Sequence, residues 1–333
     1  MKLGVAIVVI AAFAAIAAPV LAPYAPDRKF GGLLNAPPTV PHLRDDDGGW
    51  HRPFIYRWRL VDQLEQLYVE DRSARFQLVW FTQGHFVLSS NEGAAPLLLA
   101  GTDSFGRDVF SRLLFGARTS LGIAIVAALG ALLLGASVGG IAGYSGGGVD
   151  ETLMRVTDFV MVLPAMYVAL ALRSVLPLVL SPSTVFALLT IIFAILGAPF
   201  VARGVRAIVR TERRLDYAAA AEALGASGPR LLFVHLLPAA RGFLAVEMTM
   251  LIPAFVVAEA TLSYIGLGFS DPIASWGTML RDAASVRVFA DFPWLLSPAI
   301  AMFVVVLGLN LALQRAPEAM RYGRPNRGVE SIR

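Results

Sequence analysis

The side chains of this 333-residue chain that could carry chemistry are few and widely separated. Cysteine is absent, which excludes disulfides and thiolate metal sites, and the four histidines show no metal-ligand spacing. The densest polar group is the acidic run 45–47 with His51, which could form a metal or acid/base site in a membrane-anchored enzyme. Nothing places a nucleophile or a third ligand beside it. A solvated acidic loop is therefore the favoured interpretation, and we expect no metal site and no catalytic residue.

A second group of polar side chains lies inside an apolar run at 243–269, where Glu247 and Glu259 interrupt the hydrophobic sequence. A carboxylate near the middle of a bilayer costs about 2.5–3.5 kcal/mol on insertion scales, so we expect Glu259 to face the protein interior or a cavity. Two roles stay open for it. It is either a buried hydrogen-bonding group that fixes helix packing or, with Ser263 and a kink at Pro253, part of a translocation path or gate.

The composition indicates that membrane helices hold these residues. Hydrophobic residues make up 56% of the chain and charged residues 16%, which is far from a soluble domain of this length. We expect an all-α integral membrane protein with six transmembrane helices, each of about 20 apolar residues. The expected spans are 3–22, 121–144, 156–180, 184–202, 243–269 and 294–313, with a short turn at 145–155. A cleaved signal peptide is the alternative for the first stretch.

The chain divides by composition into a first helix (1–22), a polar segment (23–100), a helical core (101–313) and a tail (314–333). Inside the polar segment, residues 59–68 have the spacing of a short amphipathic helix. Residues 76–80 and 85–88 have a composition typical of strands that pair. A small subdomain outside the membrane is therefore expected.

The core begins at 101–121, where Asp103 or Ser104 can cap a helix. Arg107, Arg112 and Arg118 are then expected at the level of the lipid headgroups. An interfacial structural element is favoured here over a substrate contact.

The loop 203–241 is the most polar part of the core, with seven arginines against three acids. By the positive-inside rule it lies on the cytoplasmic side, and the tail, with five arginines against two glutamates, lies there too. Both termini are therefore expected to be cytoplasmic. Because the basic excess is concentrated in these two segments, it reports topology rather than nucleic-acid binding.

The alanine-rich run 217–224 predicts a short helix inside this loop, with Gly225 as its stop. Ser227 can cap a second helix that Pro238 ends. The result is a helix–turn–helix outside the bilayer, with a small, alanine-lined face suited to docking a partner.

This loop resembles the cytoplasmic EAA loop of ABC importer permeases, most closely those for dipeptides, oligopeptides and nickel. In that family the loop forms a coupling helix that inserts into a groove of the ATPase subunit. The resemblance implies ATPase-coupling roles for Tyr217, Ala220, Ala221, Glu222, Leu224, Gly225, Ala226, Ser227, His235 and Pro238. The sequence departs from the family pattern at Ala219, which replaces a glutamate, and at Glu222, which replaces an arginine.

Two further blocks carry the resemblance, GTDSFGRDVFSRLLFGAR at 101–118 and AEATLSYIGLGFSDPIASWGTML at 258–280. It implies one of two homologous permease subunits in a bacterial inner membrane, with two ATPase subunits, an extracytoplasmic solute-binding protein and membrane lipid as partners. The segment 23–100 would be an extracytoplasmic insertion that contacts the binding protein or caps the outer mouth. The solute would be a di- or oligopeptide, with nickel or another small solute as the alternative.

The chain contains no G-x-x-x-x-G-K-S/T phosphate loop. We therefore expect no enzymatic activity and no cofactor on this chain, with ATP and Mg bound by the ATPase subunits. A stand-alone secondary transporter or channel is a competing class, but it needs its own coupling groups. Glu259 is the one acid deep in an apolar run, and no inverted repeat is visible.

Overall fold

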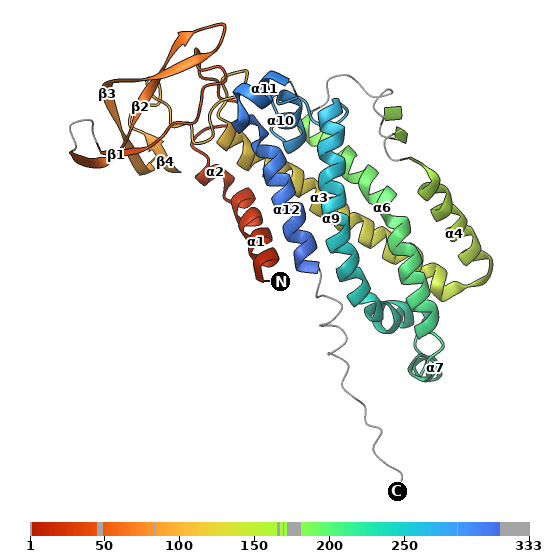
Figure 1. Cartoon of the computed structure of the whole chain (residues 1–333). Helices are drawn as coiled ribbons and strands as arrows, with labels where there is room; N and C mark the ends of the chain where they lie inside the picture. Colours follow the sequence, from red (N-terminus) through yellow and green to blue (C-terminus); the bar gives the residue numbers. More distant parts are fainter. Residues whose placement is uncertain are drawn as a thin grey trace.

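A bundle of helices carries a four-stranded sheet at one end in the computed structural model of the chain (Figure 1). The structure describes residues 2–44, 49–82, 84–164, 167–168, 170–171, 181–284 and 286–313. Its helices are α1 (Lys2–Ile16), α2 (Ala18–Leu21), α3 (Val109–Ser145), α4 (Gly147–Val162), α6 (Pro182–Glu212), α7 (Asp216–Ala223), α8 (Gly228–Arg230), η1 (Leu231–Leu236), η2 (Leu237–Ala240), α9 (Arg241–Ile265), α10 (Trp276–Asp282), α11 (Val286–Asp291), η3 (Pro293–Leu296) and α12 (Ser297–Leu313). The acidic run 45–47 and the tail 314–333 lie outside these ranges.

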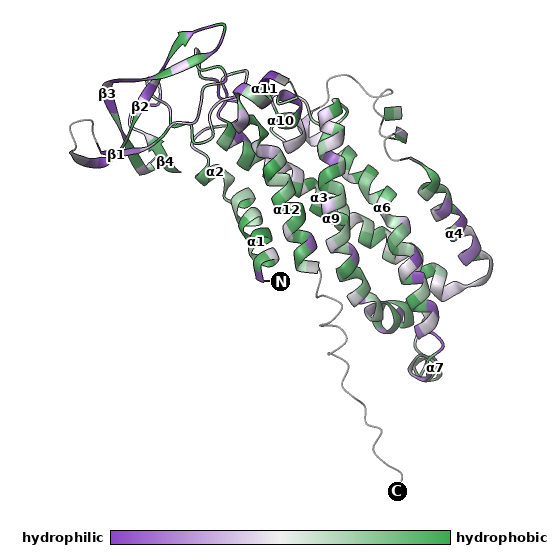
Figure 2. Ribbon diagram, in the orientation of Figure 1, coloured by the Kyte–Doolittle hydropathy of each residue, from purple (hydrophilic) through white to green (hydrophobic). Residues whose placement is uncertain are grey.

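Four helices of the described chain are long and apolar enough to cross a membrane: Val109–Ser145, Pro182–Glu212, Gly228–Ile265 and Pro293–Ala312. Their surfaces are largely hydrophobic along the bundle (Figure 2). The apolar helix α1 is shorter, because a break at Ala17 separates it from α2. Pro19 explains the break, since its ring has no N–H to donate and clashes with the carbonyl one turn earlier.

The expected turn at 145–155 is wrong in extent. The chain reverses at Gly146 and Gly147, which have φ of +66° and +56°, and α4 begins directly at Gly147. Two consecutive glycines allow this reversal because they adopt positive φ without steric cost. Helix α4 then ends at Val162, shortly before Pro164. Most of the remainder of the expected span 156–180 lies outside the described residues.

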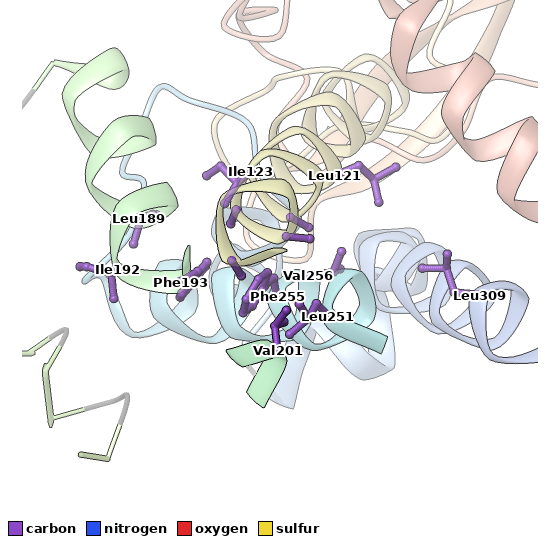
Figure 3. Close-up of a cluster of buried hydrophobic side chains, with 14 of the residues drawn as sticks. Leu121, Ile123, Leu189, Ile192, Phe193, Val201, Leu251, Phe255, Val256 and Leu309 are labelled. Atoms are coloured by element: carbon purple, nitrogen blue, oxygen red, sulfur yellow. The ribbon is translucent and has the colours of Figure 1, made fainter. Parts of the chain in front are cut away.

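The core of the bundle is built where α3 packs along α6 and α9. Small residues allow this close approach. A Cβ atom added to Gly139 would lie 2.1 Å from the carbonyl oxygen of Ala202. Between α6 and α9, Phe193 and Phe255 stack with their ring centroids 5.3 Å apart (Figure 3).

The sheet consists of β1 (His42–Arg44), β2 (Trp50–Asp62), β3 (Leu67–Thr82) and β4 (His85–Ser89), antiparallel and in sequence order. The predicted pairing of 76–80 with 85–88 is confirmed, since Val79 lies opposite Leu88.

The helix expected at 59–68 is wrong, because these residues form the end of β2, a turn and the start of β3. The Asp62 carboxylate accepts hydrogen bonds from the backbone N–H groups of Leu64 and Glu65 and so stabilises the turn. Pairing of Leu60 with Tyr68 across the strands overrides the local helical spacing.

The sheet lies at one end of the bundle, and α7 lies at the other (Figure 1). The start of α1 packs beside the end of α12, as the close approach of Gly4 to Gly308 and Ala312 shows. Both lie at the end of the bundle away from the sheet, as does α7, whereas α10 and α11 lie beside the sheet (Figure 1).

Candidate functional site

The loop between α6 and α9 folds as two short helical segments at the end of the bundle away from the sheet (Figure 1). Helix α7 covers Asp216–Ala223, close to the predicted 217–224. One alanine of the run, Ala218, is buried in the main core together with Leu231. Its neighbours Ala219 and Ala220 are exposed. Helix α7 is therefore fixed to the bundle on one side and presents small side chains on the other.

Gly225 ends α7 as predicted. Its φ is +85°, and its N–H donates to the carbonyl oxygen of Glu222 at 2.9 Å. The N–H of Ala226 donates to the carbonyl oxygen of Ala221 at 3.0 Å. This left-handed residue is the usual way to satisfy carbonyl groups at a helix end. The preceding Leu224 is left with 89% of its surface exposed.

The second segment differs from the prediction at both ends. Ser227 has the extended backbone of a capping residue, but its side chain makes no capping hydrogen bond. Pro238 does not end the helix, which continues from Gly228 through η1 and η2 into α9. A π-helical turn followed by a 3₁₀ turn takes the chain past the proline, whose missing N–H would interrupt regular α-helical bonding.

The residues expected to couple to an ATPase are gathered in this one loop, and most are accessible. The exposed ones are Tyr217, Ala220, Glu222, Leu224, Gly225, Ser227 and Pro238, and the half-buried ones are Ala221, Ala226 and His235. The Tyr217 hydroxyl donates to the Glu212 carboxylate at 2.8 Å. Partial burial and this neighbouring carboxylate raise the pKa of Tyr217 to about 12, so its hydroxyl remains a donor at neutral pH.

Sequence reasoning missed the contacts that fasten this loop to α3. The Arg213 guanidinium, at the end of α6, lies over the Tyr144 ring at 4.4 Å and donates to the Tyr144 carbonyl oxygen. On the other side of the loop, a Cβ atom at Gly228 would lie 2.8 Å from the Tyr144 hydroxyl. The Tyr144 ring is thus enclosed by the start and the end of the loop. The basic character of 203–241 was visible in the sequence, but the partner of Arg213 was not.

A bidentate ion pair connects α4 to α6 near the same end. The Arg206 guanidinium donates to both carboxylate oxygens of Asp150, with the Nη2–Oδ2 bond at 2.6 Å, and Arg210 lies 3.8 Å away. These bonds lower the pKa of Asp150. Planar, bidentate pairing of this kind also fixes geometry. The Asp150–Arg206 pair therefore holds α4 against α6.

The Glu259 side chain lies at a junction of α3, α9 and the α10 segment, and it is fully buried. Its carboxylate accepts from the hydroxyl of Ser120 at 2.6 Å and from that of Ser263 at 2.7 Å. The Ser120 oxygen in turn accepts the backbone N–H of Trp276 at 3.2 Å. This arrangement favours the packing role over the gate. Pro253 is also buried, and α9 continues through it as one helix.

The chain beyond Glu259 packs tightly onto this junction. Ser275 begins α10 with a capping box formed with Thr278. A Cβ atom added to Gly277 would lie 2.4 Å from the carbonyl oxygen of Ala260. Trp276 is buried, and its indole N–H donates to the Leu113 carbonyl oxygen at 3.2 Å.

Arg107 and Arg112, which were expected at the level of the lipid headgroups, are buried inside the protein in an ionic cluster. Arg107 donates to Asp103 at 2.7 Å, Asp271 at 2.7 Å and Asp282 at 2.9 Å. Arg112 lies within 3.5–3.9 Å of the same three carboxylates. Buried charges must be paired to offset their loss of hydration, which explains why the two arginines gather three acids.

The helix cap in this segment also differs from the prediction. Asp108, not Asp103 or Ser104, is the N-cap of α3 and accepts from the Ser111 N–H at 2.8 Å. Asp103 instead accepts from the N–H groups of Phe105 and Arg107. These bonds stabilise the turn at 103–107, which positions the Arg107 side chain in the ionic cluster.

A bundle of long apolar helices, joined by buried polar junctions and carrying an exposed helical loop, defines an integral membrane protein of the multi-helix type. Residues 131–319 match the family described as "Binding-protein-dependent transport system inner membrane component". The chain belongs to this family of membrane transport components.

Curated relatives support the same assignment. The chain is 40% identical over 214 residues to the oligopeptide transport system permease protein OppC of Bacillus subtilis, covering 63% of this chain and 67% of that protein. It is 36% identical over 212 residues to the dipeptide transport system permease protein DppC of Alkalihalophilus pseudofirmus, covering 63% and 67%. It is 34% identical over 221 residues to the glutathione transport system permease protein GsiD of Pectobacterium atrosepticum, covering 66% and 71%.

Proposed function

We propose that this chain is a permease subunit of an ATP-driven importer of di- or oligopeptides. The observation that carries the proposal is the exposed α7–Gly225 loop on a chain that belongs to the binding-protein-dependent family. The choice of peptides is supported by the names of relatives at 36–40% identity, which are oligopeptide and dipeptide permeases. A nickel or other small-solute importer is the alternative.

The loop would act as the coupling element toward an ATPase subunit. Closure of an ATP-loaded ATPase pair would push α7, and the Arg213–Tyr144 contact would pass this movement to the ends of α6 and α3. Because α3 packs along α6 and α9, the bundle would rock as a unit and alternate the side to which its solute path opens. ATP and Mg would be held by the ATPase subunits.

The proposed topology has six membrane crossings with both termini in the cytoplasm of a bacterium. Support comes from the placement of α7, the start of α1 and the end of α12 at one end of the bundle (Figure 1). The sheet at the other end would then be extracytoplasmic, in position to meet a solute-binding protein. A second, homologous permease subunit, two ATPase subunits and membrane lipid complete the proposed assembly.

The test is Gly225→Val in the assembled transporter. A β-branched residue at φ +85° strains the backbone by about 1–3 kcal/mol and would redirect Leu224. Gly32→Val is a matched control, because Gly32 also has a left-handed φ, of +81°, and open space around it. It lies between α2 and β1 in the sequence, outside the loop between α6 and α9.

We expect Gly225→Val to lose ATPase co-purification and peptide uptake, and Gly32→Val to keep both. Normal uptake by Gly225→Val would refute the coupling role. Uptake of peptide by cells that lack every ATPase partner would favour the secondary-transporter class instead. Uptake of nickel but not of peptide, with coupling intact, would leave the loop's role standing and correct the solute.

A further inference from the structure

The turn between β3 and β4 carries a cluster of exposed aromatic side chains to which the transport function assigns no role. Trp80, Phe81 and Phe86 are 48%, 79% and 38% exposed. The Phe86 ring lies 5.4 Å from that of Trp80 and 5.2 Å from that of Phe81, both edge-to-face. Contiguous exposed apolar surface of this kind marks an interaction site.

The position of this cluster along the bundle indicates what covers it. The His85 Nδ1 atom lies 2.7 Å from the carbonyl oxygen of Ala22, the residue that directly follows α2. Strand β4 packs against α2, and the two lie side by side in Figure 1. The turn is therefore at the level where the apolar stretch 3–22 ends, which is where a bilayer around α1 and α2 has its boundary.

The distribution of charge across the sheet supports the same placement. Residues 76–91, which include the second half of β3 and all of β4, contain no Asp, Glu, Lys or Arg. The first half of β3, at 67–75, contains Glu70, Asp71, Arg72 and Arg75. Strand β4, which packs against α2, and the part of β3 that pairs with it therefore carry no formal charge, whereas the first half of β3, which pairs with β2, carries four charged side chains.

We propose that the β3–β4 turn is an anchor at the membrane interface, with Trp80, Phe81 and Phe86 inserted at the headgroup–acyl boundary of the leaflet on the side of the sheet. Trp80 favours this boundary, because its apolar ring and its polar indole N–H can both be satisfied there, and Phe81 and Phe86 add apolar surface beside it.

The first test uses tryptophan fluorescence of the assembled transporter in vesicles that contain brominated phosphatidylcholine. Trp80→Phe should lose most of the quenching that depends on brominated lipid, since it removes the emitter at the boundary and keeps an apolar ring. Trp58→Phe is the control, because Trp58 lies opposite Glu70, in the part of β2 that pairs with the charged half of β3. It should keep that quenching.

The absence of cysteine provides a second, independent measurement. A nitroxide attached at Phe81→Cys should be relaxed more by oxygen than by a water-soluble nickel chelate. One at Leu64→Cys, an exposed position in the β2–β3 turn at the opposite end of these strands, should show the reverse order. Relaxation of the Phe81 label mainly by the nickel chelate would mean that the turn lies in water. Protection from both reagents would mean that protein covers it. Either result would overturn the lipid anchor while leaving the transport function untouched.

Discussion

The Glu259 carboxylate on α9 and the Ser120 hydroxyl on α3 are 139 positions apart in sequence and share a 2.6 Å hydrogen bond inside the bundle. The same Ser120 oxygen accepts the backbone N–H of Trp276, so one side chain joins three segments. Removing the Ser120 hydroxyl leaves the Glu259 carboxylate and the Trp276 N–H each with one hydrogen-bond partner fewer. This makes Ser120 the most informative residue at which to test the packing role of Glu259.

We expect Ser120→Ala to lower the free energy of unfolding in detergent by about 1–3 kcal/mol, the usual effect of leaving buried polar groups unsatisfied. Thr119→Ala is the matched control. The Thr119 hydroxyl donates within its own helix, to Phe115, and should change stability by no more than about 0.5 kcal/mol. Equal stability of the two variants would argue that the Glu259–Ser120 bond contributes nothing to helix packing.

Gly277→Ala tests the tight packing of α10 on α9. The added methyl group would lie 2.4 Å from the Ala260 carbonyl oxygen and 2.7 Å from the Ser263 Cβ atom, so the two helices must separate. Overpacking of this kind costs about 1–3 kcal/mol. Gly148→Ala in α4 has open space around it and should be neutral or slightly stabilising. Thermal unfolding of both variants in the same detergent measures the difference, and a stable Gly277→Ala protein would contradict the contact.

Local sequence signals account for the parts of the fold that were predicted correctly. The alanine run of α7 and the Gly225 stop depend on neighbouring residues and on backbone conformation, which a single sequence displays. The pairing of 76–80 with 85–88 is also local, since a short turn joins the strands. Such features need no knowledge of distant segments.

The failures arise where distant segments decide the outcome. Arg107 reaches Asp271 and Asp282, which are 164 and 175 positions away, and nothing near Arg107 in the sequence announces them. Residues 59–68 have helical spacing, yet pairing with β3 makes their first half a strand. In both cases a distant segment decides the structure. Tyr144 likewise meets Arg213 and Gly228, which are 69 or more positions away in sequence.

The ionic cluster predicts a pH effect at Asp282. Burial, then the neighbouring Asp271, raises the pKa of Asp282 from its ordinary 3.8. The folded protein therefore holds this proton more tightly than the unfolded chain does. The contribution of this titration to stability is fully present below pH 3.8 and is lost as the pH rises through the folded-state pKa.

Asp282→Asn removes this titration. The Tm difference between the unmodified chain and the variant should move in favour of the unmodified chain as the pH is lowered from neutral toward 3.8. A Tm difference for Asp282→Asn that does not change with pH would contradict the prediction.

Tyr144 contacts Arg213 and approaches Gly228, away from the exposed face of α7. A substitution of Tyr144 is therefore predicted to impair transport without preventing the ATPase subunits from binding. Tyr144→Leu removes the ring beneath the guanidinium, a contact worth about 0.5–1 kcal/mol at an exposed site, but leaves the exposed face of α7 unchanged. We therefore expect the ATPase subunits to co-purify normally while peptide uptake and peptide-stimulated ATP hydrolysis fall several-fold. Tyr144→Phe keeps the ring and should retain both activities. Loss of co-purification in Tyr144→Leu would show instead that this contact shapes the docking surface, and full uptake would show that movement of α7 reaches the bundle by another route.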